Sequence, residues 1–300
     1  MYKARAFLEI IFKNDSFFTC SDPYRKGENG EDLDADYLNI DFEIDSDAKK
    51  NEASGGVFRV YNMNKPNRRR TERDVEQVKL TVGYFDPIDN IFNFRLVYIG
   101  SKVRVDNFFD KDSAEYVTEI HAGDGYKQFT ESFTAKSWAG GVERKVVAET
   151  IAKDFGLDVR IAKGALEGKT TSAQAFCNPT KEALKLFLRD NGCEFKIIDG
   201  VTTITKKNEP TDDEVILINA ESGLLESPIV NDDGDIEFSA QLHLDMRVNR
   251  KFKLESENIS GEKKIRSFDY NGFYVCKSLK MVGDNYGAGS FDMNIVAKRL

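Results

Sequence analysis

Histidine and cysteine, the side chains that most often carry catalysis or bind transition metals, are scarce in this sequence. His121 and His243 are the only histidines among 300 residues, too few for a multi-histidine metal centre and a poor basis for a catalytic triad. His121 follows a strand-like segment and His243 alternates with leucines, which favours polar or interfacial side chains over a general base. The four cysteines lie far apart without a CxxC pair, so we interpret them as reduced, mostly packed thiols: Cys20, Cys177, Cys193 and Cys276.

Carboxylates are abundant, but no motif selects any of them for catalysis or ligand binding. The acidic segment Asn231–Asp235 lacks the ligand spacing of an EF-hand and is interpreted as a hairpin turn. The glycines fit no dinucleotide-binding or phosphate-binding loop, and neither a GxSxG elbow nor an HExxH helix is present. The sequence therefore predicts no enzyme, no catalytic residue, no metal and no cofactor. A lysozyme-like acid and nucleophile pair has no signature here and stays open as an alternative.

Charge and hydropathy restrict the possible partners. With 43 basic and 51 acidic side chains the net charge is −8, which argues against a surface built to grip phosphate backbones. No stretch approaches the roughly 18 apolar residues that cross a bilayer. Because the first 13 residues also lack the features of a signal peptide, we expect a soluble protein that is not exported.

Strands dominate both ends of the predicted structure. Leu38, Ile40, Phe42 and Ile44 alternate with polar residues, the pattern of a strand with one buried and one solvated face. Similar alternation recurs in three further segments, Val78–Tyr84, Ile91–Ile99 and Phe291–Ala297. The dipeptides Asp233-Gly234 and Asn271-Gly272 are favoured hairpin turns, because these residues tolerate positive φ.

The middle of the chain predicts two helices and a hairpin. Val142, Val146, Val147, Ile151 and Phe155 share one helical face. A second helix is expected after Asn178 as N-cap and Pro179, and it ends at Gly192. A hairpin with its turn at Asp199-Gly200 follows, and then the polar linker Lys206–Asp213. The sequence thus predicts a mainly β (α+β) fold with a small α/β insert.

Two long polar loops are expected within the first β region, Ser21–Asp36 and Asn62–Gln77. The second contains Lys65 and the predicted contact residues Arg68, Arg69, Arg70 and Arg73. Because no aromatic residues are interleaved with these arginines, a nucleic-acid site is disfavoured. A solvated loop, or an arm that forms salt bridges with an acidic neighbouring subunit, is preferred, since long loops often order against a partner.

Several local motifs occur in an order that resembles a known family. They are Val82-Gly83-Tyr84, Ile91-Phe92, Ala122–Gly125, the α/β module Trp138–Lys206, Gly223-Leu224, Ser227-Pro228, Tyr274-Val275, Gly283-Asp284 and Phe291–Ala297. In this order the chain, from about residue 40 onward, resembles the baseplate hub proteins of contractile-tailed bacteriophages, the phage protein D or late control protein group. It departs from the family at Asp245-Met246-Arg247, where proline or glycine is common.

This resemblance implies a non-enzymatic homotrimer in the tail baseplate of a virion, assembled in the host cytoplasm. Each subunit would contain two tail-tube-like β-barrels and an insert, here residues 1–136, 137–210 and 211–300. The implied partners are the tail tube protein, the central spike protein and other baseplate proteins. DNA would pass through transiently, without specific binding.

A channel for DNA should repel phosphates, because attractive basic contacts would hold the DNA in place. We therefore expect Asp41, Glu43 and Asp45, on the polar face of their strand, to line the lumen. The alternative functions are a tail-associated cell-wall hydrolase or another component of the spike complex. A carbohydrate-binding β-sandwich is disfavoured, because Trp138 is the only tryptophan.

Overall fold

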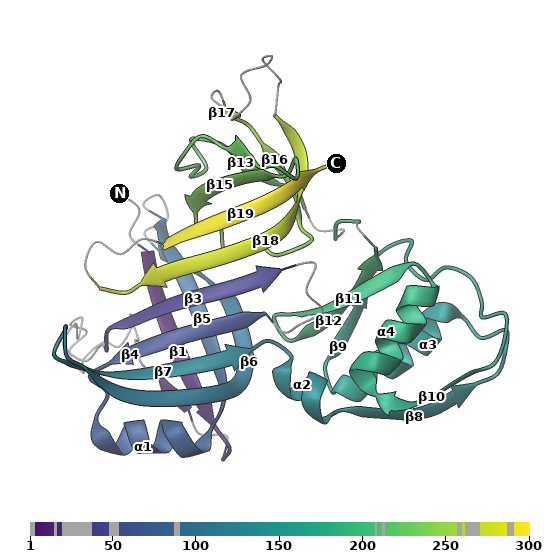
Figure 1. Cartoon of the computed structure of the whole chain (residues 1–300), viewed down its shortest axis with the longest axis horizontal. Helices are drawn as coiled ribbons and strands as arrows, with labels where there is room; N and C mark the ends of the chain where they lie inside the picture. Colours follow the sequence, from purple (N-terminus) through teal and green to yellow (C-terminus); the bar gives the residue numbers. More distant parts are fainter. Residues whose placement is uncertain are drawn as a thin grey trace.

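The computed structural model describes residues 4–14, 17–19, 38–47, 54–86, 91–207, 209–211, 214–256, 260–261, 271–286 and 291–300. Two β regions lie against each other, and a smaller module of helices and short strands extends from their side (Figure 1). Cys20 and the predicted loop Ser21–Asp36 lie outside the described residues. Within the described part, no helix is both long and apolar enough to cross a membrane.

The first β region contains seven strands and one helix. Strand β3 (Ile40–Asp47) has the predicted alternation, with its apolar residues buried and the intervening acidic ones at least partly solvated. The remaining elements are β1 (Ala4–Phe12), β2 (Phe17–Thr19), β4 (Gly55–Tyr61), α1 (Lys65–Asp74), β5 (Val75–Asp86), β6 (Ile91–Asp110) and β7 (Glu115–Gly123).

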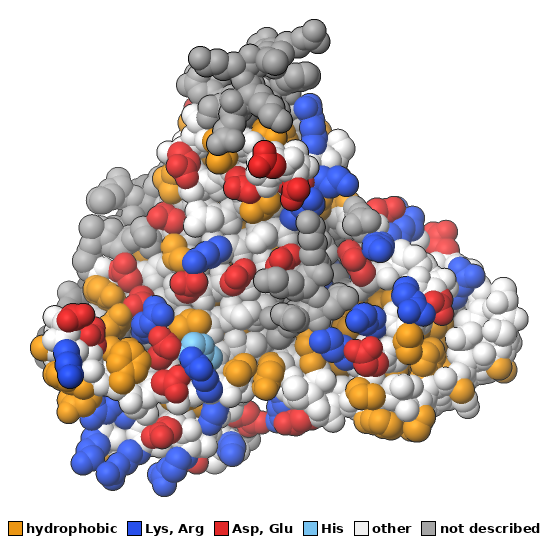
Figure 2. All heavy atoms as spheres, viewed as in Figure 1, with side chains coloured by type: hydrophobic (Ala, Val, Ile, Leu, Met, Phe, Trp, Pro, Cys, Tyr) orange, Lys and Arg blue, Asp and Glu red, His pale blue; other side chains and the backbone are white. Residues whose placement is uncertain are grey.

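The expected loop Asn62–Gln77 is wrong, because α1 takes up residues 65–74 and β5 begins at Val75. Asn64 caps the helix by accepting a hydrogen bond from the backbone N–H of Asn67 at 2.9 Å. Only Thr71 of the helix is buried, so α1 has no apolar stripe from which it could be recognised. Figure 2 shows basic side chains gathered over this helix at the lower edge of the molecule.

The second β region supplies seven more strands and joins the first through hydrogen bonds. Its strands are β13 (Ile216–Ile218), β14 (Ile229–Val230), β15 (Ile236–Gln241), β16 (Lys251–Leu254), β17 (Ser260–Gly261), β18 (Gly272–Asp284) and β19 (Phe291–Arg299). Strand β18 pairs antiparallel with β3, from Ser278 opposite Asp47 to Asp284 opposite Asp41. All described strands of both regions therefore belong to one 14-stranded sheet.

The strand order is β17-β14-β15-β19-β18-β3-β4-β7-β6-β5-β1-β2, and β13 joins through β16, which pairs with β18. Among the described strands the order does not return to its start, so no closed barrel forms. The mainly β fold with a small α/β insert is confirmed, whereas two separate barrels are not.

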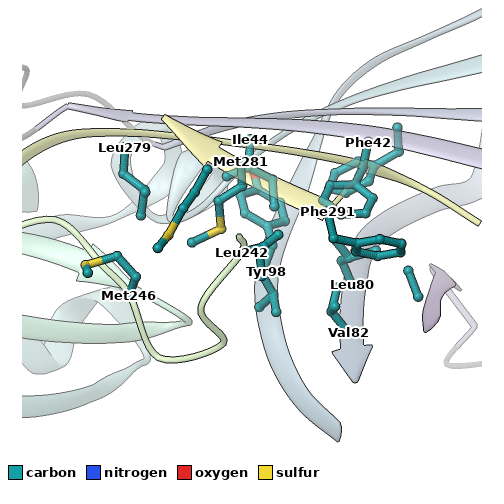
Figure 3. Close-up of a cluster of buried hydrophobic side chains, with 14 of the residues drawn as sticks. Phe42, Ile44, Leu80, Val82, Tyr98, Leu242, Met246, Leu279, Met281 and Phe291 are labelled. Carbon is teal, nitrogen blue, oxygen red and sulfur yellow. The ribbon is translucent and has the colours of Figure 1, made fainter. Parts of the chain in front are cut away.

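One hydrophobic core runs through both β regions. Figure 3 shows part of it, where Phe42 and Ile44 of β3 lie near Met281 of β18 and Phe291 of β19. The rings of Phe42 and Phe291 lie 5.9 Å apart between centroids. A Cβ added to Gly283 would lie 2.6 Å from Cζ of Phe42, so the β18–β3 contact requires glycine at this position.

The insert forms a second, separate core between helices and short strands. Its elements, after the short helix α2 (Tyr126–Glu131), are β8 (Phe133–Trp138), α3 (Arg144–Ala152), the 3-10 turn η2 (Lys153–Phe155), β9 (Asp158–Ile161), β10 (Gln174–Pro179), α4 (Thr180–Asp190), β11 (Cys193–Ile198) and β12 (Val201–Lys206). Both predicted helices and the hairpin are confirmed, with two differences. Asn178 and Pro179 end β10 because they pair with β8, so α4 begins one residue later than expected. Val142 lies before α3 begins, and Val146 is exposed, so neither belongs to the buried stripe of the helix.

The insert is fixed to the sheet by polar groups around the tip of its β11–β12 hairpin, of which Asp124 is buried and Asp199 and Arg247 are partly buried. The Asp124 carboxylate accepts hydrogen bonds from the backbone N–H groups of Asp199, at 2.8 Å, and Gly200, at 3.3 Å. Arg247, from the second β region, donates from Nε to the Asp199 carboxylate at 2.8 Å. Its Nη2 donates to the Leu96 carbonyl of β6 at 3.0 Å. Three parts of the chain thus meet at one cluster of hydrogen-bonded polar side chains.

Burial, with a smaller contribution from nearby Asp199, raises the pKa of Asp124 to about 7. In the unfolded chain an aspartate titrates near its ordinary value, so the folded state holds a proton that the unfolded state releases. The stability linked to Asp124 is therefore present at acid pH and is lost as the pH rises through about 7.

We predict that Asp124→Asn flattens this dependence. The wild-type chain should lose about 2 kcal/mol more unfolding free energy than the variant between pH 5 and pH 8. Urea unfolding across this range measures the slopes, and Asp232→Asn, at an exposed turn, is the matched control that should keep the wild-type slope. Parallel profiles for wild type and Asp124→Asn would show that Asp124 does not titrate in this window.

Candidate functional site: charged assembly surfaces

The three residues predicted to face a lumen lie side by side on the polar face of β3. Asp45 is exposed, and Asp41 and Glu43 are partly buried, while their neighbours in the strand point into the core. Figure 2 shows acidic and basic side chains interleaved over the sheet face that carries β3, β4 and β7. Their position on one solvated face is as predicted, and their place in a lumen stays a prediction.

Basic residues of neighbouring strands partly neutralise this acidic row. Arg59 of β4 forms a 3.1 Å ion pair with Asp41, and Lys280 of β18 forms a 2.8 Å pair with Glu43. The Tyr61 hydroxyl also donates to Asp41 at 2.5 Å. Sequence reasoning missed Arg59 and Lys280, because their proximity depends on strand order and register.

The ion pairs continue across β4, β7 and β6. Glu119 accepts from Arg59 Nε at 2.7 Å through one oxygen and contacts His121 Nε2 at 2.7 Å through the other. Arg104 and Asp106 of β6 form a 3.0 Å pair beside them. Partial burial acts to raise the pKa of Glu119, but hydrogen bonds with His121 and Arg59 outweigh it and the pKa is lowered. His121 is thus a polar network residue, in line with its prediction.

Asp106, Glu119 and His121 also have a spacing that could hold a metal ion, since one ligand atom of each lies within 4.8 Å of the others. Arg59 already pairs with Glu119, and Arg104 Nη2 lies 3.1 Å from His121 Nε2. A divalent cation would have to compete with two guanidinium groups for these ligands. The arrangement favours a salt-bridge network over a metal centre.

The predicted arginine cluster divides into two pairs on α1. Arg68 stacks on the Tyr116 ring and Arg70 on the Phe12 ring, each with its guanidinium carbon 3.9 Å from the ring centroid. Arg69 and Arg73 are exposed, and Arg73 Nε donates to the Arg69 carbonyl at 3.3 Å. The first pair is held by cation–π contacts within the chain, and the second faces solvent.

Exposed aromatic side chains lie beside these arginines, although none is near them in the sequence. Phe108 and Phe109 of β6 and Tyr116 of β7 line a groove of about 280 Å³ together with Lys65, Arg68 and Arg69 of α1. Phe109 is 49% exposed, and its ring lies 5.0 Å from that of Tyr116. The sequence analysis found no aromatic residues between these arginines along the chain. In the folded structure, aromatic residues from β6 and β7 nevertheless lie beside them.

We predict that Arg59, which joins two carboxylates, stabilises the fold more than the exposed Arg69 does. Arg59→Gln should lower the unfolding free energy at pH 7 by about 1 kcal/mol, because Asp41 and Glu119 lose their shared partner. The loss should shrink only as the pH falls through the lowered pKa of Glu119, because this carboxylate then becomes protonated and no longer pairs with Arg59. The control Arg69→Gln should change stability by less than about 0.5 kcal/mol. Equal losses in the two variants at pH 7 would contradict the network.

Comparison with solved structures finds the same fold along the whole chain. The 43 kDa tail protein of prophage MuSo2 from Shewanella oneidensis superimposes with a TM-score of 0.59 at 9% identity, covering 99% of this chain and 97% of that one. A chain of the Francisella PdpA-VgrG complex gives 0.55 at 9% identity, with 100% of this chain and 58% of that one covered. The Escherichia coli c3393 protein, a type VI secretion component similar to the T4 tail proteins gp27 and gp5, gives 0.51 at 7% identity, covering 88% and 74%.

No family model matches the sequence, and a search of curated proteins finds no significant match. The solved structures nevertheless agree with the resemblance expected from the order of the sequence motifs, because phage tail and secretion proteins share this fold over most or all of the chain. The chain therefore has the fold of these phage tail and type VI secretion proteins.

Proposed function

We propose that this chain is a structural hub subunit of a contractile phage tail, located in the baseplate of the virion and assembled in the host cytoplasm. In this proposal three copies form a collar between the tail tube protein and the central spike protein, in contact with other baseplate proteins. The observation that carries it is the match of 99% of this chain to 97% of a prophage tail protein.

The shared sheet suits such a collar. Two β regions in each of three copies would present six similar units to a six-fold tube, and the proposed tube-like halves correspond to residues 1–136 and 211–300. Because β18 and β3 are hydrogen bonded over seven residue pairs, the angle between the halves is set within each copy before assembly. A preformed angle reduces the entropy lost when the ring closes.

We further propose that Asp41, Glu43 and Asp45 face the channel. The basic residues nearest to them, Arg59 and Lys280, are engaged in ion pairs with carboxylates. On this face the basic groups are already paired with carboxylates, and acidic groups are in excess. Such a face attracts DNA phosphates only weakly, so DNA would pass without specific binding.

A cell-wall hydrolase is a weaker proposal for this chain. The most perturbed carboxylate among the described residues, Asp124, is buried and accepts two backbone hydrogen bonds at the insert junction. This carboxylate holds the tip of the β11–β12 hairpin in place, and its burial leaves it inaccessible to a glycan. A role elsewhere in the spike complex remains the alternative, supported by the match to the PdpA-VgrG complex.

The mass of the purified assembly, alone and mixed with the tube and spike proteins of the same tail, tests this proposal. We predict three copies of the 34.0 kDa chain and a larger complex with each partner, without clearing of purified cell walls. A chain that stays monomeric and binds neither partner would contradict the hub, and cell-wall clearing abolished by one carboxylate substitution would favour the hydrolase.

A further inference from the structure

One end of the molecule carries a basic and aromatic surface that no other described residue covers completely. We call it the basic patch and define it as Lys65, Arg69 and Arg73 of α1 with Phe108 and Phe109 of β6. All five side chains are exposed, and one carboxylate, the exposed Glu72 of α1, lines the groove beside this helix. Arginine and aromatic residues are enriched where proteins bind one another, because they combine large apolar area with directed polar contacts.

The opposite end carries an acidic and apolar surface. The sequence contains no lysine or arginine between Lys207 and Arg247. Within this stretch Leu225 and Ile229 are exposed, and so are carboxylates before, between and after them in the chain. We call these residues the acidic patch: Glu221, Leu225, Glu226, Ile229, Asp232 and Asp233. Leu225 is 57% exposed, and with Glu221 and Glu226 it lines a groove of about 880 Å³. Lys253 lines the same groove, where it forms a 2.6 Å ion pair with Glu255.

The two patches cannot meet within one chain. Figure 1 places α1 at the lower end of the first β region and β15 in the second. The strand order puts β14 beyond β15, so the shared sheet lies between α1 and both strands. Figure 2 shows basic side chains gathered at the lower end, and acidic and hydrophobic side chains together with some basic ones near the upper end. Two complementary surfaces on opposite ends of one molecule allow a heterologous contact, in which each copy binds the next one head to tail. Such contacts close into a ring when the rotations from copy to copy add up to a full turn.

We propose that the basic patch of one copy docks on the acidic patch of the next, head to tail around the ring. The proposal rests on the self-assembly in the proposed function and adds the surfaces that make the contact. Phe108 and Phe109 would cover Leu225 and Ile229, while Arg69 and Arg73 pair with Asp232 and Asp233. The apolar contact supplies affinity, and the charges set the register and the rate of encounter.

A second copy fits the basic patch better than nucleic acid does. Arg68 and Arg70, which could widen a phosphate-binding surface, are stacked on rings of their own chain. The chain as a whole carries a net charge of −8, which repels a polyanion but leaves the acidic patch available as a complement.

Charge reversal of each patch tests the contact. Arg69→Glu with Arg73→Glu, or Asp232→Lys with Asp233→Lys, places like charges opposite each other and should raise the concentration for half-assembly about 10- to 100-fold. The four substitutions in one chain restore opposite charges and should recover the wild-type trimer. Lys163→Glu with Lys169→Glu, two exposed lysines of the insert, is the control of equal charge change and should assemble normally. Mass photometry across a concentration and salt series measures all five proteins.

A mixture of the two single-patch variants provides an independent check. Opposite charges then meet only where unlike copies touch. A ring of three contains at least one contact between like copies, so the mixture should assemble better than either variant alone but less tightly than the wild type. Recovery in the fourfold variant also shows that the parent variants fold, since misfolding in either parent could not be repaired from a distant surface.

The outcomes separate this proposal from the one on which it rests. A trimeric wild type whose single-patch variants assemble unchanged, or a fourfold variant no better than its parents, would overturn the contact and leave the hub intact. Variants that keep their mass but lose binding to the tube protein or to DNA would likewise overturn it and assign the basic patch to that partner. A monomeric wild type would contradict both proposals.

Discussion

The pairing of β18 with β3 is the constraint on which the rest of the structure depends. It joins strands more than 230 residues apart in the chain and converts two β regions into one sheet with one hydrophobic core. Two features allow the close contact: Gly283, which leaves room for the Phe42 ring, and the ring contact between Phe42 and Phe291. Without this pairing each region would expose an edge strand and an apolar face, which promotes aggregation.

The same constraint explains how a small insert can be held in one place. Its hairpin tip reaches the junction of the two β regions, where Asp124, Asp199 and Arg247 satisfy one another and the nearby backbone. Lys196, whose pKa burial lowers to about 8, donates to the Asp47 carbonyl at the end of β3. Buried charges are tolerated only when they are paired, so these contacts also specify one orientation of the insert.

Local features of the fold could be predicted from the sequence, and features that depend on distant contacts could not. The alternation around Phe42, the Asp199-Gly200 turn and the insert helices follow from periodicity and turn chemistry. Helix α1 was missed because its only buried residue is Thr71, which leaves no apolar pattern to detect. The acidic row and the arginine cluster were found, but their partners, Arg59, Lys280 and the β6–β7 aromatics, come from strands whose register the sequence does not reveal.

These observations support a rigid, two-part unit whose opposite ends carry complementary charge and whose sheet carries a neutralised acidic row. A cryo-electron microscopy map of the purified assembly tests this view most directly. The account predicts three copies around an open channel, with Asp41, Glu43 and Asp45 toward the channel and α1 of each copy against residues 221–233 of its neighbour. A single copy, or a closed pair that leaves both ends in solvent, would contradict it.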